Sequence, residues 1–348
     1  LAALAGVALL AIPSSPAHKK VTLGLDLQGG LEVVLKAVPP PGKTCDAACM
    51  DRSVSIMRSR IDKLGVSEPE IRKQGNNQIV IQLAGVHDVN KAAQIIGTTA
   101  QLQFYDFEVD AVGPSEGGVA NGSLYNLLSQ VQKDTKGGAS AYYLFNAKKQ
   151  KVAGPEDTRE RLLNSTLPSG RQLKGEVPKG FTVLGVPPKG IVISCDQATG
   201  CPGVQQADAT APTVYYLFKY DPPAVPEATG EDLKLSDIAA DISTQGQGNV
   251  VRLGFTGKGA DKFHDITRKE AQRGASAAAA AGQTGADAVQ QYAQHFAIVL
   301  DGELKSTPYI DYKQNPDGID PRGTGAEISN IRSIGEAQDL ALVLQTGA

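Results

Sequence analysis

The chain has 348 residues and a formal net charge of -3, with 34 basic and 37 acidic residues. This length is typical of about two domains with a sizeable core, and the balanced charge excludes a global field that would recruit nucleic acid. Trp is absent and aromatic residues make up 5% of the chain, which argues against stacking platforms for single-stranded nucleic acid.

The chain begins with an apolar segment, residues 1–12. As a helix it would span ~18 Å, which is shorter than the ~30 Å hydrocarbon core of a bilayer. Two interpretations stay open. We favour the end of a truncated first transmembrane helix, followed by a linker to residue 18, because no basic segment precedes the apolar run. The alternative is a signal peptide with a poor cleavage site at Ser15-Pro16-Ala17. Either interpretation sends the remainder of the chain across a membrane.

A glycine-rich segment comes next and leads directly into a predicted strand, 31–38. Three glycines around an Asp and a Gln suit a backbone that turns tightly or approaches another backbone closely. A phosphate-binding loop is excluded, because neither a helix nor a Gly-Lys-Ser/Thr motif follows. The segment consists of Gly24, Leu25, Asp26, Leu27, Gln28, Gly29 and Gly30.

The rest of the first third predicts the order β-α-β-β-α-β. Apolar residues at helical spacing indicate a helix over 46–64, and the turn Gly75-Asn76-Asn77 indicates a hairpin between 70–73 and 78–83. Asp88 is expected to cap a short helix that ends at Gly97, and a final strand is expected over 100–109.

The middle of the chain, 111–230, has 26 Gly or Pro residues and only short apolar runs. We expect an inserted, strand-rich head domain over 110–230. Two chain crossings, Val109–Gly113 and Pro226–Glu231, would connect it to the rest of the chain. Because few contacts need to cross such a boundary, we expect the head to move about a hinge at these crossings. The predicted hinge residues are Val109, Gly113, Pro226 and Gly230.

The last hundred residues repeat the order of the first third. A strand is expected over 249–255, then a helix capped by Thr256 and a hairpin around Asp301-Gly302. Ser333 and Glu336 form a capping box for a last helix. The sequence therefore predicts an α+β fold: a ferredoxin-like base built from two β-α-β-β-α halves on an antiparallel sheet, formed by 19–109 and 231–348. An Ala-rich insert, 274–288, either extends a helix or forms a loop.

The four cysteines form two close pairs, Cys45 with Cys49 and Cys195 with Cys201. Neither spacing is C-x-x-C and no His adjoins a cysteine, so a structural zinc site is disfavoured. We expect two short-loop disulfides in an oxidising compartment; two pairs of reduced, buried thiols are the alternative.

Motifs for chemistry are weak in this sequence. The segment 113–117 matches G-x-S-x-G, but the residues after it do not favour the helix that a nucleophile elbow needs. Residues 41–44 resemble the end of a P-loop without its first glycine. Glu108 and Asp110 are interpreted as solvated charges at a strand end. The sequence therefore predicts no catalytic, cofactor-binding or metal-binding residues.

Two motifs carry a resemblance to the SecD family of the bacterial Sec export machinery. The first is the glycine-rich segment 24–30. In the second, Gly65 ends a helix and Pro69 biases the chain toward extended geometry. Segments 79–88, 99–104, 255–267, 296–308 and 336–348 are similar to that family in the same order, whereas 111–230 resembles it weakly. The second motif consists of Leu64, Gly65, Val66, Ser67, Glu68 and Pro69.

The resemblance implies the first extracytoplasmic domain of a multi-pass protein in the bacterial plasma membrane, with a ferredoxin-like base and an inserted head. It implies SecF, the SecYEG channel and unfolded preproteins as partners. The role would be non-enzymatic: to bind emerging preprotein and help export driven by the protonmotive force. The alternative is a ligand-binding porter or sensor domain of an RND-type transporter, whose superfamily also uses ferredoxin-like modules.

Overall fold

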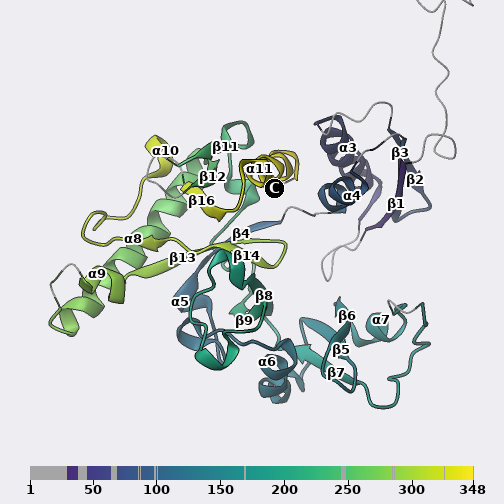
Figure 1. Ribbon diagram of the computed structural model, residues 1–348, viewed down its shortest axis with the longest axis horizontal. Helices are drawn as coiled ribbons and strands as arrows, with labels where there is room; N and C mark the ends of the chain where they lie inside the picture. Colours follow the sequence, from purple (N-terminus) through teal and green to yellow (C-terminus); the bar gives the residue numbers. More distant parts are fainter. Residues whose placement is uncertain are drawn as a thin grey trace, which may run out of the picture. The chain divides into compact units, whose positions relative to one another are not determined.

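The computed structural model describes residues 30–37, 45–63, 69–84, 86, 88–97, 99, 101–167, 170–243, 248–283, 285, 287–324 and 326–347. The described residues up to Gly97 form one compact unit, and those from Thr99 onward form a second (Figure 1).

The first unit has the order β-α-β-β-α that the sequence predicts. An antiparallel sheet of order β1-β3-β2 pairs Gly30 with Ala84 and Glu70 with Gln82. Both helices contribute to its core, in which Ile61 from α3 and Ile96 from α4 meet Ile81 of the central strand. The elements are β1 (Gly30–Lys36), α3 (Ala47–Lys63), β2 (Glu70–Gln74), β3 (Gln78–Ala84) and α4 (Val89–Gly97).

The second unit is built around a seven-stranded sheet of order β10-β4-β13-β14-β8-β9, with β15 also paired to β13. All its pairings are antiparallel except that of β14 with β8, where Glu303 faces Ser194. The strands are β4 (Leu102–Asp106), β8 (Gly190–Asp196), β9 (Thr213–Lys219), β10 (Ala228–Thr229), β13 (Gln294–Leu300), β14 (Glu303–Ser306) and β15 (Tyr309–Ile310).

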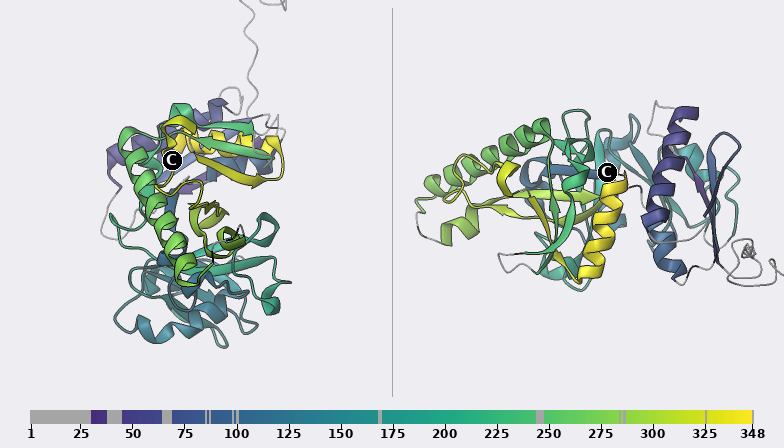
Figure 2. Two further views of the ribbon diagram at one scale, coloured as in Figure 1. Left: turned by 90° about the vertical axis from the view of Figure 1, so that its left-hand side faces the viewer. Right: turned by 90° about the horizontal axis from the view of Figure 1, so that it is seen from above.

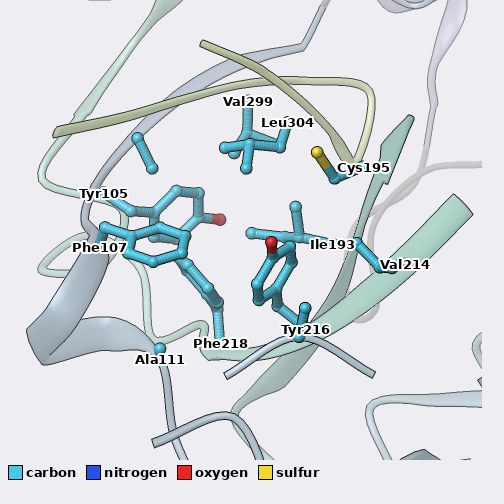
Figure 3. Close-up of a cluster of buried hydrophobic side chains, with 12 residues drawn as sticks. Tyr105, Phe107, Ala111, Ile193, Cys195, Val214, Tyr216, Phe218, Val299 and Leu304 are labelled. Carbon is cyan, nitrogen blue, oxygen red and sulfur yellow. The ribbon is translucent and has the colours of Figure 1, made fainter. Parts of the chain in front are cut away.

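One buried core covers this sheet and draws on three parts of the sequence (Figure 3). Its aromatic side chains make edge-on contacts, with Phe107 and Phe218 at 5.5 Å and Tyr105 and Phe218 at 5.4 Å between ring centroids. The core therefore joins residues of the predicted head to residues of both predicted halves of the base. Its larger members are Tyr105, Phe107, Ile193, Tyr216, Phe218, Val299 and Leu304.

Two three-stranded sheets complete the second unit. In one, of order β11-β12-β16, the sheet packs against α11 (Figure 2). In the other, of order β6-β5-β7, the central strand packs against α7, and α6 packs against β7. The strands are β5 (Ala141–Phe145), β6 (Lys151–Glu156), β7 (Thr182–Val186), β11 (Ala239–Ile242), β12 (Asn249–Leu253) and β16 (Ala326–Ile331).

The helices of the second unit are mostly short. They are α5 (Phe107–Asp110), α6 (Leu124–Gln130), α7 (Arg159–Leu163), α8 (Gly257–Ala280), α9 (Asp287–Tyr292), α10 (Pro321–Thr324) and α11 (Ile334–Gly347). Single 3-10 turns lie at Glu116–Gly118, Gln132–Thr135, Gln197–Thr199, Gln206–Asp208, Gly230–Asp232 and Leu235–Asp237.

Helix α8 decides one alternative that the sequence left open. The Thr256 hydroxyl accepts the Gly259 N–H at 3.1 Å, which confirms the predicted cap. The helix then continues through the Ala-rich residues to Ala280, so the start of the insert extends a helix. Gly274 allows a close approach, because a Cβ there would lie 3.0 Å from the Tyr292 carbonyl oxygen.

The structure differs from the prediction in how the strands are grouped. The strand expected at the end of the first half is β4, which pairs with β10 and β13 in the second unit, and Phe107–Asp110 form a helix. Within the described residues, β1, β2 and β3 of the predicted first half form a sheet of their own, whereas β4 of that half joins β13 and β14 of the second half. Every residue of β4 is buried, so this strand needs neighbours on both edges and cover on both faces. The architecture is mixed α/β with several sheets, and the part of the chain that the structure describes does not confirm the single shared sheet of the predicted base.

Candidate functional site

The two chain crossings that bound residues 110–230 meet at one edge of the large sheet. β10 runs antiparallel to β4, with Ala228 opposite Phe104. The Glu227 N–H donates to the Phe104 carbonyl at 3.0 Å. The structure therefore places the second crossing beside β4, the strand that leads into the first crossing.

The predicted hinge residues differ in their surroundings. Val109 is 43% exposed on α5, and Gly113 is exposed in the turn that follows. Pro226 and Gly230 are buried on either side of β10. A hinge at these positions stays a prediction.

Five carboxyl groups gather where the crossings meet, and we call them the carboxyl cluster. They come from the end of β4, from α5, from the residue before β10 and from α8, and each acts electrostatically on at least one other. The members are Asp106, Glu108, Asp110, Glu227 and Glu270.

Asp106 is held by an arginine from α8. Arg273 Nη2 donates to Asp106 Oδ1 at 2.6 Å, and the Arg273 Nε donates to Gln294 Oε1 at 3.4 Å. The side chain of Asp106 is 8% exposed and that of Arg273 is 35% exposed. Burial raises the pKa of Asp106, and the Arg273 charge opposes that rise without cancelling it.

The carboxylates of α5 are fixed by the backbone and by a histidine. Glu108 accepts the His295 N–H at 2.9 Å, and His295 Nδ1 lies 2.6 Å from its other oxygen. Asp110 Oδ2 accepts the N–H of Asp106 at 3.0 Å. These bonds orient both side chains toward β4 and β13.

The side chains of Asp110 and Glu227 lie within hydrogen-bonding reach of each other, and the buried Oε2 of Glu227 has no other partner within the described residues. A hydrogen bond between two carboxyl groups requires a proton on one of them. Burial, followed by the charge of Asp110, raises the pKa of Glu227 to about 8, and burial also raises the pKa of Asp110. At neutral pH the pair therefore shares a proton.

Glu270 enters the cluster from α8. Its side chain has no solvent exposure, and neither carboxyl oxygen has a hydrogen-bond partner within the described residues. Burial, reinforced by Asp106 and Glu108, raises its pKa well above the usual value for a glutamate. Glu270 is therefore neutral at pH values where an exposed glutamate is ionised.

The interpretation of Glu108 and Asp110 as solvated charges is wrong for Asp110, which is 2% exposed, and Glu108 is half-buried. The helix α5 turns the chain back onto the sheet immediately after β4. The sequence predicts a continued strand at these residues. Glu270 was missed altogether, although a signal was present. It falls on the apolar helical face of α8, whose buried residues include Phe263, Ile266, Thr267, Ala271 and Gly274.

The G-x-S-x-G motif serves the backbone. Ser115 is fully buried, and its hydroxyl accepts the Leu217 N–H at 3.1 Å. A 3-10 turn follows it, with Gly117 at φ 72°. The strand–turn–helix of a nucleophile elbow is absent at this position, so the serine binds β9 and is not presented for catalysis.

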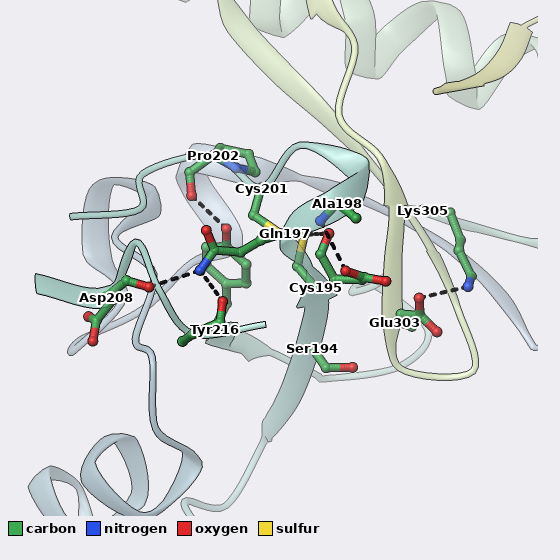
Figure 4. The surroundings of a disulfide bond; sticks show 12 residues. Ser194, Cys195, Gln197, Ala198, Cys201, Pro202, Asp208, Tyr216, Glu303 and Lys305 are labelled. Carbon is green, nitrogen blue, oxygen red and sulfur yellow. Dashed lines mark hydrogen bonds and ion pairs between the residues drawn. A yellow bond between two sulfur atoms is a disulfide. The ribbon is translucent and has the colours of Figure 1, made fainter. Parts of the chain in front are cut away.

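Both predicted disulfides are present. The disulfide between Cys45 and Cys49 lies at the start of α3, and its Cα atoms are 5.2 Å apart. The Cα atoms of the disulfide between Cys195 and Cys201 are 6.0 Å apart (Figure 4). Cys195 is the next-to-last residue of β8 and lies in the buried core, and the carbonyl of Pro202 accepts a hydrogen bond from the Tyr216 hydroxyl. The second disulfide therefore fastens a loop onto the main core.

Most of the family motif lies outside the described residues. This applies to 24–29 and to 64–68, and also to the apolar segment and linker, 1–18. Gly30 is the first residue of β1, and Pro69 directly precedes β2. In the part of the chain that the structure describes, no helix is both long and apolar enough to cross a bilayer.

Within the described ranges, no group of three or more His, Cys, Asp or Glu residues is arranged to hold a metal ion. A surface depression of about 550 Å³ lies beside Arg273. Its lining residues are Lys269, Gln272, Arg273, Ser276, Ala277 and Gln294.

Two family models match separate parts of the chain. Residues 50–109 match the N-terminal part of the P1 domain of protein translocase subunit SecDF, and residues 208–348 match the P1 head subdomain of SecDF. The head match overlaps the predicted head, 110–230, only over 208–230, and the predicted domain boundaries stay a prediction.

Individual relatives agree with these matches. The chain is 49% identical over 84 residues to protein translocase subunit SecD of Sebaldella termitidis, covering 24% of this chain and 21% of that one. It is 26% identical over 353 residues to SecDF of Thermus thermophilus, covering 99% of this chain and 32% of that one. The chain thus spans a third or less of the length of these relatives.

Two solved structures are also similar. A crystal structure of SecDF in a super-membrane-facing form matches with a TM-score of 0.47 and 24% identity, over 99% of this chain and 32% of that one. A second, of a membrane component SecDF that enhances protein export, matches with a TM-score of 0.44 and 21% identity, over 91% and 94%.

Proposed function

This chain belongs to the SecD family of protein translocase subunits, and from that premise we propose that it forms the extracytoplasmic domain of a subunit that assists protein export. The observation that supports this most is the order of the matches: one SecDF family model covers 50–109 and another covers 208–348. Several full-length relatives are protein translocase subunits by name.

The two disulfides support a location on the outer side of the plasma membrane. Cys45–Cys49 and Cys195–Cys201 both close short loops, and such bonds persist in oxidising compartments. Membrane spans outside the described residues would anchor the domain in a multi-pass protein.

We propose a non-enzymatic role. The domain binds unfolded preprotein as it emerges from the SecYEG channel and acts with SecF, which the relatives named SecDF suggest as a partner. The protonmotive force would drive this help through membrane segments. Ser115, the nucleophile of the weak hydrolase motif, is buried and bonded to the backbone, which supports a binding role over catalysis.

Depletion of the full-length protein tests the proposal. We expect unprocessed secretory precursors to accumulate, because export slows while synthesis continues. Restoring the full-length protein should clear them, whereas a version that lacks 30–347 should not. Levels of cytoplasmic proteins serve as the control. Normal secretion after depletion would contradict the proposal.

The RND porter or sensor alternative rests on the depression beside Arg273, whose volume of about 550 Å³ suits a small molecule. The two functions differ in what binds. An unfolded polypeptide that protects the chain in hydrogen exchange supports the export role, and a small polar ligand that protects α8 alone supports the alternative.

A further inference from the structure

We propose that the carboxyl cluster is a proton-operated latch, which joins the two chain crossings of residues 110–230 when it is protonated and releases them when it ionises. The inference goes beyond the export role and does not depend on it.

Backbone N–H groups hold the two carboxyl groups of the latch near each other. Asp110 belongs to the first crossing and Glu227 to the second, and their side chains lie within hydrogen-bonding reach of each other. Two hydrogen bonds from backbone N–H groups flank this pair: Glu227 N–H donates to the Phe104 carbonyl, and Asp106 N–H donates to the Oδ2 atom of Asp110. Loss of the shared proton would place two like charges in contact at the point where the crossings meet.

Glu270 provides an independent indication that the site binds protons. It is fully buried, comes from α8 and not from either crossing, and has two carboxyl oxygens without a partner among the described residues. The charges of Asp106, Glu108 and Glu227 each raise the pKa of Glu270, so it belongs to the same cluster. An ionised carboxylate in that position would lack both water and a hydrogen-bond donor, so the folded site favours the protonated form.

The excess of acidic over basic groups around the carboxyl cluster also favours protonated carboxyl groups. Against five carboxyl groups stand Arg273, Lys219 and, when it is protonated, His295. Lys219 Nζ donates to the Val109 carbonyl at 3.2 Å, so it lies at the border of the cluster. Full ionisation would leave a net negative charge in a largely buried site. The titratable and charged groups that face the cluster are Tyr105 and Asp106 of β4, Glu108 and Asp110 of α5, Lys219 of β9, Tyr220, Glu227, Glu270 and Arg273 of α8, and His295 of β13.

The direction of the pH effect follows from these raised pKa values. The folded state holds protons that the unfolded chain releases near the usual glutamate pKa of 4.5. The stability that these protons provide is complete below that value and is lost as the pH rises toward about 8, the pKa of Glu227. The latch therefore opens on the alkaline side.

Hydrogen–deuterium exchange on the purified chain tests the latch. After correction for intrinsic exchange, the amides of Asp106 and Glu227 should lose about tenfold or more protection between about pH 5 and about pH 8. Amides of β5, which lies in another sheet, should not change in this way. Equal protection at both pH values would overturn the proposal.

Variants separate the latch from a general pH effect. Glu227→Gln keeps a hydrogen-bonding side chain that does not ionise, so most of the pH dependence of protection at the crossings should be lost. Glu270→Gln should reduce the dependence in part. Glu231→Gln, at an exposed position at the end of the same crossing, is the matched control and should behave as the wild type. A wild-type response in Glu227→Gln, or a lost response in Glu231→Gln, would overturn the latch.

A measurement on the unaltered chain avoids any failure of a variant to fold. Infrared difference spectra detect protonated carboxyl groups directly, and at about pH 7 the chain should retain absorbance from more than one of them. This absorbance should disappear over the same pH range in which protection is lost. Complete ionisation of all carboxyl groups below about pH 5 would overturn the proposal, because no proton would remain to operate the latch.

Discussion

Arg273 and Ser115 show how single side chains stabilise the second unit. Arg273 supplies positive charge to a buried carboxylate, and Ser115 supplies an acceptor to a buried backbone N–H. Neither role was predicted, because the sequence separates each residue from its partner by more than one hundred positions. Asp110 was misread for the same reason: the partner that explains its burial, Glu227, lies at the other crossing. The disulfides were predicted correctly because both cysteines of each pair lie within one turn of chain.

Arg273→Met should destabilise the chain by about 2 to 4 kcal/mol at neutral pH, because Asp106 is then left buried beside other carboxyl groups. This loss of stability lies at the low end of what breaking a buried ion pair costs, because the Arg273 side chain is one-third exposed. The loss should be smaller near pH 5, where Asp106, with its raised pKa, binds a proton more readily. Denaturant unfolding at the two pH values measures it. Arg268→Met, which removes an exposed pair with Asp265, is the control and should change little. An equal loss in both variants would contradict the prediction.

Ser115→Ala should cost about 1 to 3 kcal/mol, because the Leu217 N–H is left buried without an acceptor. Ser129→Ala removes an exposed hydroxyl that donates to a helix carbonyl and should have little effect. The comparison uses the free energy of unfolding of both variants. Equal values would show that the buried bond contributes nothing.

At the level of elements, local sequence signals predict the order of helices and strands along the chain. They do not predict which strands pair in a sheet. The hairpin between β2 and β3, the cap of α8 and the turn between β13 and β14 all depend on residues next to each other in sequence. The partners of β4 do not. Its apolar pattern indicated a strand, but nothing within 102–106 distinguishes β3 from β13 as a neighbour. The sheet was therefore misassigned although the strand was found.

The disulfide at the end of β8 should matter more than the one at α3. Replacing both Cys195 and Cys201 by Ala should cost about 2 to 3 kcal/mol, because the loop gains freedom when unfolded and Cys195 sits in the main core. The matching change at Cys45 and Cys49, which are more exposed, should cost about 1 to 2 kcal/mol. Denaturant unfolding ranks the two double variants, and the opposite order would contradict the prediction.

At the scale of the whole molecule, the described residues form two units with separate cores. Ile61, Ile81 and Ile96 belong to the core of the first, and Tyr105, Phe218 and Val299 to a core of the second. Motion of 110–230 against the rest of the chain stays a prediction. The shared core constrains such a motion. The residues that β4, β8, β9 and β13 contribute to it would have to separate or move as one body.

The two units should unfold in separate transitions. We expect residues 30–97 to fold when expressed alone and to melt together with one of the two transitions of the whole chain, because their sheet and core are internal to the unit. Calorimetry of the chain and of the fragment measures this. One coincident transition by every probe, with the isolated fragment unfolded, would contradict it.

The pairing of β4 with β13 affects how the chain folds when its N-terminal residues become free to fold before its C-terminal ones. Phe296 lies opposite Asp106, a separation of 190 residues (296 minus 106). Such long-range pairing slows folding, because a large loop must close before the contact forms. The first unit can fold as soon as it emerges, whereas β4, every residue of which is buried in the finished sheet, must wait for its neighbour. During that interval an apolar strand is exposed, so the chain passes through an aggregation-prone state before the sheet closes.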